Sequence, residues 1–369
     1  MFRPIKSSSH HGLTEMECLK QETGKNWTMI NGDCCQVIKG IPDNSIDFCC
    51  HSPPFAGLYI YSPSEADLGN CSSNEEFIRH YEFLIAELYR VTVPGRLCAI
   101  HVKDLPLYLN RDDAAGLIDF PGMCIQAFTD KGWTFHSRVT IWKCPVTERE
   151  RTNNHGLLHK TILKDSSGSR QGMADYLIVF RKGNGTMVSD KPVHPDGCVE
   201  QVGESGETEQ KPRGLTRYLG SSNPLESEVH PSPYARTSRP KEDEEGNTDA
   251  TRQSITIWRR YAEPVWWDID QTDVLNYKPA REDKDERHIC PLQMGVIERA
   301  IHLWTNPGDV VLTPFGGIGS ELVGAIRQGR KAIGIELKEA YFNIACRNCR
   351  IEESKASAPT LFDVEELGG

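Results

Sequence analysis

The sequence lacks a long hydrophobic run. None of its apolar stretches approaches the ~18–20 residues that a helix needs to cross a bilayer. Residues 1–25 also lack the short apolar core of a secretory signal peptide. Both absences argue against a membrane span and against export. We therefore expect a cytoplasmic protein with no membrane partner.

Cysteine is present, but without the spacing that disulfides or zinc need. The 13 cysteines are an odd number and are scattered through expected strands and helices. Cys346 and Cys349 form one CxxC pair, and no second Cys or His pair with matching spacing follows it. Reduced thiols and no metal site are therefore expected.

The chain also lacks an overall positive charge, because its formal net charge is -10 at pH 7. This argues against attraction of nucleic acid by the whole surface, although a local basic face would suffice. Residues 131–183 contain ten Lys and Arg against four Asp and Glu. Seven of these cations are candidates for contacts with nucleic-acid phosphates: Arg138, Lys143, Arg149, Arg151, Lys160, Lys164 and Arg170.

The first third of the chain predicts alternating strands and helices. Residues 46–50 are a nearly continuous apolar run, typical of a strand covered on both faces, and two prolines end it. A capping box at Ser73 precedes apolar residues at helical spacing as far as Leu88. Pro94-Gly95 is expected to break this helix before a buried strand at residues 97–102.

The middle of the chain predicts an antiparallel edge and then an insertion. Residues 133–143 and 176–180 are rich in aromatic and β-branched side chains and should pair, with the basic segment between them as a loop. Residues 184–254 contain no Ile, Phe or Trp, which indicates a linker or a poorly ordered insertion. The tryptophans behind it are expected in local core: Trp258, Trp266 and Trp267.

The last unit predicts a complete βαβ motif. A helix at residues 291–304 precedes a strand at 309–312. The glycine turn Phe315-Gly316-Gly317-Ile318-Gly319 follows, and Ser320 is expected to cap the next helix. A second strand at residues 331–335 ends in Glu336.

This glycine turn predicts a nucleoside site without a pyrophosphate. Glycines let the backbone approach a ligand, and a carboxylate such as Glu336 at the tip of the second strand can accept hydrogen bonds from ribose. The turn is F-x-G-x-G, not G-x-G-x-x-G, and lacks the G-K-[ST] that holds phosphates. This disfavours NAD and ATP and favours S-adenosyl-L-methionine. The candidate residues are Phe315, Gly317, Gly319, Ser320 and Glu336.

Ser52-Pro53-Pro54-Phe55 supplies groups for chemistry on an exocyclic base amine. Such a reaction needs acceptors for the amino hydrogens, which a hydroxyl and a backbone carbonyl provide. An aromatic ring such as Phe55 offers a flipped-out base a surface for stacking. Two prolines keep the loop rigid. Alone, S-P-P-F is only a stiff turn; its place after a buried strand, in a chain with the glycine unit, favours a catalytic loop.

The two motifs together resemble the S-adenosylmethionine-dependent amino-methyltransferases of DNA. S-P-P-F stands near the N-terminus, and T-P-F-G-G-I-G-S with G-I-E-L near the C-terminus, in the order of the β group of that family. The resemblance covers residues 28–182 and 285–350. It implies an α/β, Rossmann-like methyltransferase fold with a mostly parallel sheet, an antiparallel edge hairpin, permuted motif order and an inserted recognition region.

The resemblance also implies roles for single residues. Asp33 would contact the adenine of S-adenosyl-L-methionine, and Pro291, in the segment 288–292, would lie beside its methionine moiety. Thr313 stands where the family usually has an acidic residue and offers a hydroxyl without charge. The serine form of the catalytic motif is associated with N4 of cytosine, and the Asp or Asn form with N6 of adenine.

Five segments are expected on this basis. They are an N-terminal extension (1–26), the catalytic half of the methyltransferase domain (27–183), a partly disordered target-recognition insertion or linker (184–284), the S-adenosylmethionine-binding half (285–352) and an acidic tail (353–369).

The resemblance favours methylation of cytosine N4 in double-stranded DNA, and other readings stay open. Adenine N6 is the first alternative; a protein or RNA substrate, or an inactive DNA-binding homologue, are others. Cytosine C5 chemistry is disfavoured because it usually needs a Pro-Cys loop, and only the reverse order, Cys144-Pro145, occurs. A prokaryotic or phage source, a cognate restriction nuclease as partner, and either a monomer or a dimer are compatible with the sequence.

Overall fold

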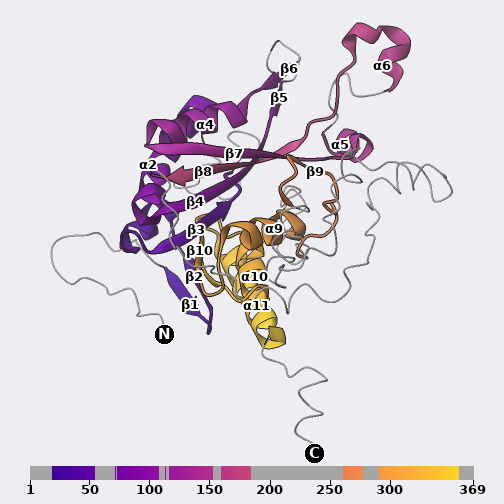
Figure 1. Cartoon of the computed structure of the whole chain (residues 1–369). Coiled ribbons are helices and arrows are strands. Elements are labelled where there is room, and N and C mark those ends of the chain that lie inside the picture. Colours follow the sequence, from indigo (N-terminus) through magenta and orange to yellow (C-terminus); the bar gives the residue numbers. More distant parts are fainter. Residues whose placement is uncertain are drawn as a thin grey trace, which may run out of the picture.

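The structure, a computed structural model, describes residues 19–54, 71, 73–107, 113, 116–152, 159–183, 261–276 and 291–356, with the side chains of residues 150–152 and 356 excepted. Its centre is a nine-stranded sheet in the order β1-β2-β11-β10-β3-β4-β8-β7-β9 (Figure 1). The strands are β1 (Lys20–Thr23), β2 (Trp27–Asn31), β3 (Ile46–His51), β4 (Thr92–Lys103), β7 (Trp133–Ile141), β8 (Asp175–Lys182), β9 (Val265–Trp266), β10 (Val310–Thr313) and β11 (Lys331–Glu336).

Most of the sheet is parallel. The five central strands β2, β11, β10, β3 and β4 pair in parallel, whereas β8 pairs antiparallel with both β4 and β7. The predicted parallel sheet with an antiparallel hairpin is therefore confirmed, with β9 added in parallel outside β7. A separate ribbon pairs β5 (Leu105–Leu107) with β6 (Gly116–Ile118).

Helices cover both faces of the sheet (Figure 1). One layer contains α1 (Cys34–Val37), the 3₁₀ turn η1 (Ile38–Gly40), α2 (Asn74–Val91) and α4 (Phe120–Asp130). The other contains α9 (Met294–Trp304), α10 (Ser320–Arg327) and α11 (Glu339–Ala356). Successive residues of β3 enter different cores, since Phe48 packs in the second layer and Cys49 in the first. This two-sided burial explains the nearly unbroken apolar run of β3.

The helix α2 begins as its sequence predicts and ends earlier. Ser73 Oγ accepts a hydrogen bond from Glu76 N at 3.1 Å. The helix ends at Val91, so Pro94-Gly95 lies within the start of β4 instead of breaking the helix. A residue before proline disfavours helical backbone angles, and the first residues of a strand tolerate proline.

Two local expectations are wrong. The basic segment between β7 and β8, expected as a loop, contains α5 (Pro145–Thr152), α6 (His159–Lys164) and the 3₁₀ turn η3 (Ser166–Gly168). Ser320 does not cap α10, because Gly319 is the N-cap residue and no side chain caps this helix. The turn requires φ of +89° at the capping position, which glycine adopts without strain and serine does not.

The expected outer segments contribute to the fold where they are described. β1 lies in the expected N-terminal extension and pairs with β2, and α11 runs into the expected tail as far as Ala356. Most of the expected insertion, residues 184–260 and 277–284, lies outside the described residues, as does Trp258. Trp266 is buried in the core beside Arg299, as predicted. No helix within the described ranges is long and apolar enough to cross a membrane.

Asn31 joins β2 to β11 at the carboxyl edge, and its loss should destabilise the fold. Its buried side-chain amide donates to the carbonyl oxygens of Glu336 and Leu337, both at 2.9 Å. Asn31→Ala removes both hydrogen bonds and leaves the Leu337 carbonyl without its donor, whereas the Glu336 carbonyl still accepts from Gly32 N. The substitution should lower the free energy of unfolding by about 1–3 kcal/mol, measured by urea denaturation. The control Gln126→Ala removes an exposed hydrogen bond to Asp130 and should change it by less than about 0.5 kcal/mol. Equal effects would contradict this assignment.

Candidate functional site

The two sequence motifs meet at the point where the strand order of the sheet reverses. From β3 the chain continues to β4 on one side, and from β10 to β11 on the other, although β3 and β10 are neighbours. Open α/β sheets bind ligands beyond the carboxyl ends of the strands at such a point. Ser52 follows β3 there, and Phe315 follows β10.

The glycine turn is tied to the carboxylate at the end of β11. Gly317 N donates to Glu336 Oε2 at 2.8 Å, and Lys338 N donates to Oε1 at 2.8 Å. Gly316 N donates to the Ile335 carbonyl at 2.7 Å. Gly317 and Gly319 have φ of +49° and +89°, values that favour glycine. The turn and the carboxylate therefore form one rigid unit.

This unit has room and polar capacity for a ligand. A Cβ atom added to Gly317 would meet nothing within 4 Å, whereas one added to Gly319 would lie 3.2 Å from Ala345. The Thr313 side chain is buried, and its Oγ1 has no hydrogen-bond partner among the residues that the structure describes. An unpaired buried hydroxyl fits a polar ligand group. The residues present thus fit the methionine and ribose portions of S-adenosyl-L-methionine.

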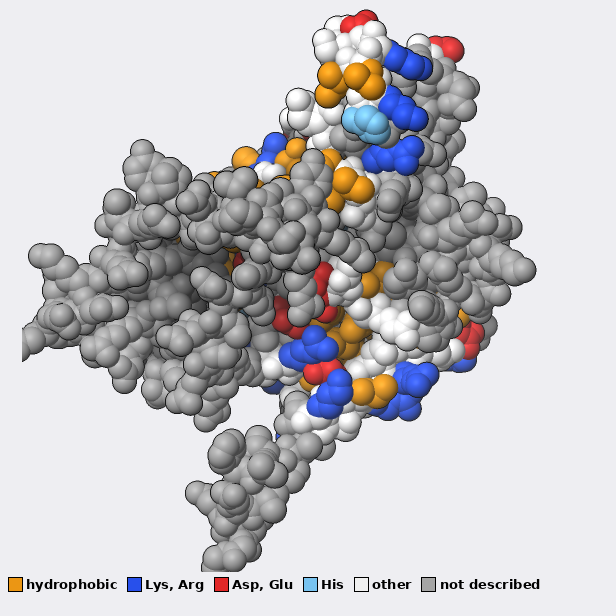
Figure 2. All heavy atoms as spheres, turned by 90° about the vertical axis from the view of Figure 1, so that its right-hand side faces the viewer, with side chains coloured by type: hydrophobic (Ala, Val, Ile, Leu, Met, Phe, Trp, Pro, Cys, Tyr) orange, Lys and Arg blue, Asp and Glu red, His pale blue; other side chains and the backbone are white. Residues whose placement is uncertain are grey.

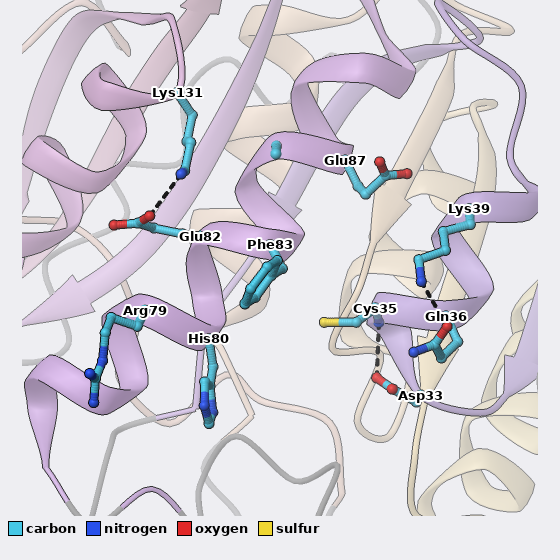
Figure 3. A pocket seen from close by; sticks show the side chains of 11 residues that line it. Asp33, Cys35, Gln36, Lys39, Arg79, His80, Glu82, Phe83, Glu87 and Lys131 are labelled. Carbon is cyan, nitrogen blue, oxygen red and sulfur yellow. Dashed lines mark hydrogen bonds and ion pairs between the residues drawn. The ribbon is translucent and has the colours of Figure 1, made fainter.

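Asp33 lies beside the same edge, one strand further out. Gly32 N donates to the Glu336 carbonyl at 3.0 Å, which holds the loop after β2 against the end of β11. Asp33 caps α1, since its Oδ1 accepts from Cys35 N at 2.9 Å, and burial raises its pKa. It borders a groove of about 610 Å³ between α1 and α2 (Figure 3). Pro291, half-buried, stands three residues before α9.

Ser52 begins a chain of buried polar side chains. Its Oγ lies 3.2 Å from His101 Nδ1 at the end of β4, and His101 Nε2 lies 2.9 Å from Asp175 Oδ2 at the start of β8. Lys143 Nζ lies 2.7 Å from the same Asp175 oxygen. Burial opposes the charge of Asp175, but Lys143 and His101 outweigh it and hold the pKa of Asp175 below its usual range.

His51 fixes the loop from behind. Its ring is buried, with Nε2 2.6 Å from the Tyr81 hydroxyl, and burial lowers its pKa to about 3. The ring centroids of His51 and Phe315 are 5.6 Å apart, so the end of β3, directly before Ser52, is in contact with the glycine turn. Pro53 is buried and Pro54 half-buried, while Phe55 lies outside the described residues.

The same histidine belongs to a cluster with metal-ligand atoms. Those of Cys49, His51 and Cys98 lie within 4.8 Å of one another. Burial raises the pKa of the Cys49 thiol well above its usual value, so it stays protonated, whereas metals bind thiolates. Cys49 Sγ lies 3.4 Å from His51 Nδ1. These contacts make the cluster a support for the His51 ring.

The basic candidates are distributed unequally. Lys143 does not fit a phosphate contact, because its side chain is only 8% exposed and pairs with Asp175. Arg170 is half-buried and donates to the Gly116 carbonyl at 3.0 Å. The Arg151 side chain lies outside the described set. The remaining candidates are exposed: Arg138, Arg149, Lys160 and Lys164.

Three of the exposed cations, Arg149, Lys160 and Lys164, lie on the segment that joins β7 to β8, and Arg138 lies within β7 itself. That segment leaves the sheet at the carboxyl end of β7 and returns at the amino end of β8, so it starts and ends at the same edge as Ser52. It projects from the body of the molecule (Figure 1). Basic and hydrophobic side chains gather at its tip, where α6 lies (Figure 2).

Three residues of the site escape sequence reasoning. His101 and Asp175 stand at the ends of separate strands, and only their pairing register brings them together. Glu321 comes two residues after the glycine turn, and this position in the sequence is the signal that could have identified it. Glu321 is 6% exposed. The pKa of the Cys50 thiol is raised mainly because Cys50 is buried, and next by the charge of Glu321. Cys50 is one step beyond the Leu312–Cys49 pair in the ladder, level with Thr313.

The fold and the site define a nucleoside-binding α/β protein with a hydroxyl-bearing loop beside the nucleoside site. Residues 46–347 match the family model N6_N4_Mtase, described as DNA methylase. The chain therefore belongs to this family of DNA methylases.

Two curated relatives extend over most of the chain. The DNA adenine methyltransferase YhdJ of Escherichia coli (strain K12) is 36% identical over 340 residues, 92% of this chain and 87% of the relative. The type II methyltransferase M.BamHI of Bacillus amyloliquefaciens is 23% identical over 312 residues, 84% of this chain. The match spans only 54% of M.BamHI, about half its length.

Solved structures share the fold. TTHA0409 of Thermus thermophilus, complexed with S-adenosyl-L-methionine, superposes with a TM-score of 0.51 at 20% identity over 88% of this chain and 94% of that chain. The PvuII DNA methyltransferase, which is cytosine-N4-specific, gives 0.50 at 15% identity over 90% and 89%. These likenesses confirm the predicted Rossmann-like methyltransferase fold.

Glu321 should make stability depend on pH. Burial raises the pKa of Glu321 from 4.5 to about 7, so between these values the folded chain holds a proton that the unfolded chain has lost. The free energy of unfolding therefore falls as pH rises through this window, by up to about 3 kcal/mol. Glu321→Gln should remove this loss and stabilise the protein at pH 8 more than at pH 4.5. Urea denaturation of both proteins at both pH values measures it; an equal difference at the two would refute the buried carboxyl's role.

Proposed function

We propose that this protein transfers a methyl group from S-adenosyl-L-methionine to the exocyclic N4 of a flipped-out cytosine in double-stranded DNA. The observation that carries the proposal is the placement of the Ser52 hydroxyl, after β3, beside the glycine turn after β10. One motif offers an acceptor for an amine, and the other offers a nucleoside site. Their contact through His51 and Phe315 allows both reactants to lie next to each other.

The cofactor half is formed by two neighbouring loops. S-adenosyl-L-methionine, when bound, supplies a methyl group on a positively charged sulfur. We assign its ribose to Glu336, its adenine to Asp33, and its methionine portion to Pro291, Thr313, Phe315, Gly317, Gly319 and Ser320. Two backbone amides donate to Glu336, one to each carboxylate oxygen, and they fix the orientation of this carboxylate.

Glu321 is our candidate for the acid that Thr313 does not supply. It is buried in the first turn of α10, on the side of the sheet where Cys50 lies level with Thr313. We assign to this carboxylate the role of balancing the ammonium or sulfonium charge of the methionine portion. The negative charge that the family usually has at the end of the strand, where Thr313 stands, would thus come from Glu321 in helix α10.

DNA is assigned to the exposed cations of β7 and of the segment between β7 and β8. Arg138, Arg149, Lys160 and Lys164 can neutralise phosphates without contacting the catalytic loop, and Arg151 shares α5 with Arg149. Charge concentrated on one projecting segment accounts for DNA binding by a chain of net charge -10. A base flipped from DNA held there enters at the edge of the sheet that carries Ser52.

Gly317→Asn should block the cofactor without disturbing the backbone. Asparagine tolerates positive φ, and its side chain would occupy the open space at this turn. We expect the dissociation constant for S-adenosyl-L-methionine, measured by calorimetry, to rise at least about tenfold. Gly308→Asn is a matched control, since Gly308 also has positive φ and open space but precedes β10 at the opposite edge. Equal affinities of the two variants for S-adenosyl-L-methionine would contradict the assignment of the cofactor to this turn.

The methylated base is the direct test of the function. DNA from a host without its own methylases, expressing this protein, should contain N4-methylcytosine by nucleoside mass spectrometry. Ser52→Ala should abolish this product while calorimetry shows unchanged cofactor affinity, because the hydroxyl acts on the base. A host that expresses the wild type and gains no methylated nucleoside would disprove the proposal.

Adenine N6 is the second candidate, and one observation favours it. YhdJ, 36% identical over 92% of this chain, is a DNA adenine methyltransferase. Ser52 favours cytosine, because the resemblance associates the serine form with N4. The same nucleoside measurement decides: N6-methyladenine without N4-methylcytosine would move the assignment to adenine.

A further inference from the structure

The Ser52–His101–Asp175 chain has an order that the methylation reaction can use. A serine hydroxyl donates one hydrogen bond and accepts two, so its hydrogen must be placed before it can accept from an amine. Nothing in Ser52 itself fixes that hydrogen. The nearest ring nitrogen, His101 Nδ1 at 3.2 Å, is therefore the group that decides which way the hydroxyl points.

The state of the His101 ring follows from its other neighbour. Asp175 is ionised, since its pKa is held below the usual range, and an ionised carboxylate only accepts hydrogen bonds. Nε2, 2.9 Å from Asp175 Oδ2, must then carry a hydrogen. In the neutral ring this leaves Nδ1 as the acceptor, and the Ser52 hydroxyl donates to it. Lys143 at 2.7 Å keeps the carboxylate charged and in place.

We propose that His101, oriented by Asp175 and Lys143, is the positioning residue that turns the lone pairs of Ser52 toward the target amine and takes up the proton released on methylation. The inference rests on the proposed function. It assigns a role to three side chains that lie on three different strands or their ends, β4, β8 and β7.

The proton balance is closed by this chain. The amine nitrogen exchanges one N–H bond for a bond to the methyl carbon, while the carbon–sulfur bond breaks and its electron pair stays on sulfur. The released proton goes to Ser52 Oγ as the hydroxyl hydrogen moves to His101 Nδ1. The ring becomes an imidazolium paired with Asp175 and then loses its proton to solvent. No further reactant is needed.

A hydrolytic use of the same three residues is disfavoured by the loop. Serine hydrolases stabilise an oxyanion with backbone amides, among them that of the residue after the nucleophile. Pro53 and Pro54 follow Ser52 and carry no amide hydrogen. The Ser52 hydroxyl is thus set up to accept a hydrogen bond, not to attack a carbonyl.

The pH profile separates this role from a structural one. Protonated His101 would donate to Ser52 and occupy a lone pair, so the single-turnover rate should fall at acid pH. Among the described residues, the charged groups near the ring are Asp175, which contacts it, and Lys143, which pairs with Asp175. Two residues further along β4, Lys103 pairs with Glu148 of α5. Glu321, whose pKa burial raises to about 7, titrates in the same region. A variant that keeps Glu321 and lacks the imidazole isolates His101.

His101→Asn is the test, and His136→Asn is its matched control. Asparagine can still accept from Ser52 near the Nδ1 position but cannot take up a proton. We expect the single-turnover rate, with cofactor already bound, to fall about 100-fold at pH 8, with cofactor affinity unchanged and the acid limb lost. His136 Nδ1 also lies near a serine, 3.0 Å from Ser137 Oγ, but on the exposed middle of β7. Its replacement should leave rate and profile as in the wild type.

Two further measurements keep the outcomes distinct. Urea denaturation of His101→Asn checks folding, and Asp175→Asn, which permits the other tautomer, should lower the rate with the same unchanged cofactor affinity. Normal product from the wild type, with a wild-type rate and acid limb in His101→Asn, overturns the inference and leaves the proposed function standing. A wild type that forms no methylated base removes both.

Discussion

The parallel pairing of β3 with β10 is the constraint on which the site depends. Asp47 and Val310, 263 positions apart, are joined by a hydrogen bond of 2.9 Å from the Val310 amide to the Asp47 carboxylate. Arg96 of β4 reaches both Asp47 at 3.6 Å and Asp309 at 3.0 Å, which ties the amino ends of three neighbouring strands together. A slip of one residue would turn every side chain of β3 to the other face. Fixing the register at one edge therefore fixes Ser52 against Phe315 at the other.

Buried polar side chains gather at the carboxyl edge of the sheet. His51, His101, Asp175 and Lys143 are all largely buried, and each has a partner at hydrogen-bonding distance. Thr313 Oγ1 lacks one within the described chain. Burial of unpaired polar atoms costs stability, so natural proteins keep them where function requires them. The unpaired Thr313 hydroxyl at the carboxyl edge is therefore consistent with a ligand site there.

The sequence predicts well what short-range chemistry determines. The strand before Ser52 and the capping box at Ser73 depend on neighbours a few positions away, and the glycine turn binds Glu336 only 19 positions further on; all three form as expected. The turn also shows the limit, because Gly319 and not Ser320 caps α10: a φ of +89° overrides the usual preference for a serine cap. The prediction of a phosphate contact for Lys143 is wrong, and the sequence does not predict His101 as a site residue, for the same reason. Their partner Asp175 is 32 and 74 positions away, and only the β4–β8–β7 register brings the three together.

The position of the acid changes how the cofactor region can be charged. An acidic residue at the strand end, where Thr313 stands, would lie beside the turn with a fixed charge. Glu321 sits in the first turn of α10, where the helix dipole favours a carboxylate, yet burial raises its pKa to about 7. Near neutral pH its charge is thus conditional. Because a nearby cation lowers the pKa of a carboxyl, binding of a positively charged ligand and ionisation of Glu321 must favour each other. On our assignment the unliganded protein has no permanent buried charge at Glu321. Binding of the positively charged cofactor favours ionisation of Glu321, and the resulting carboxylate stabilises the bound cofactor.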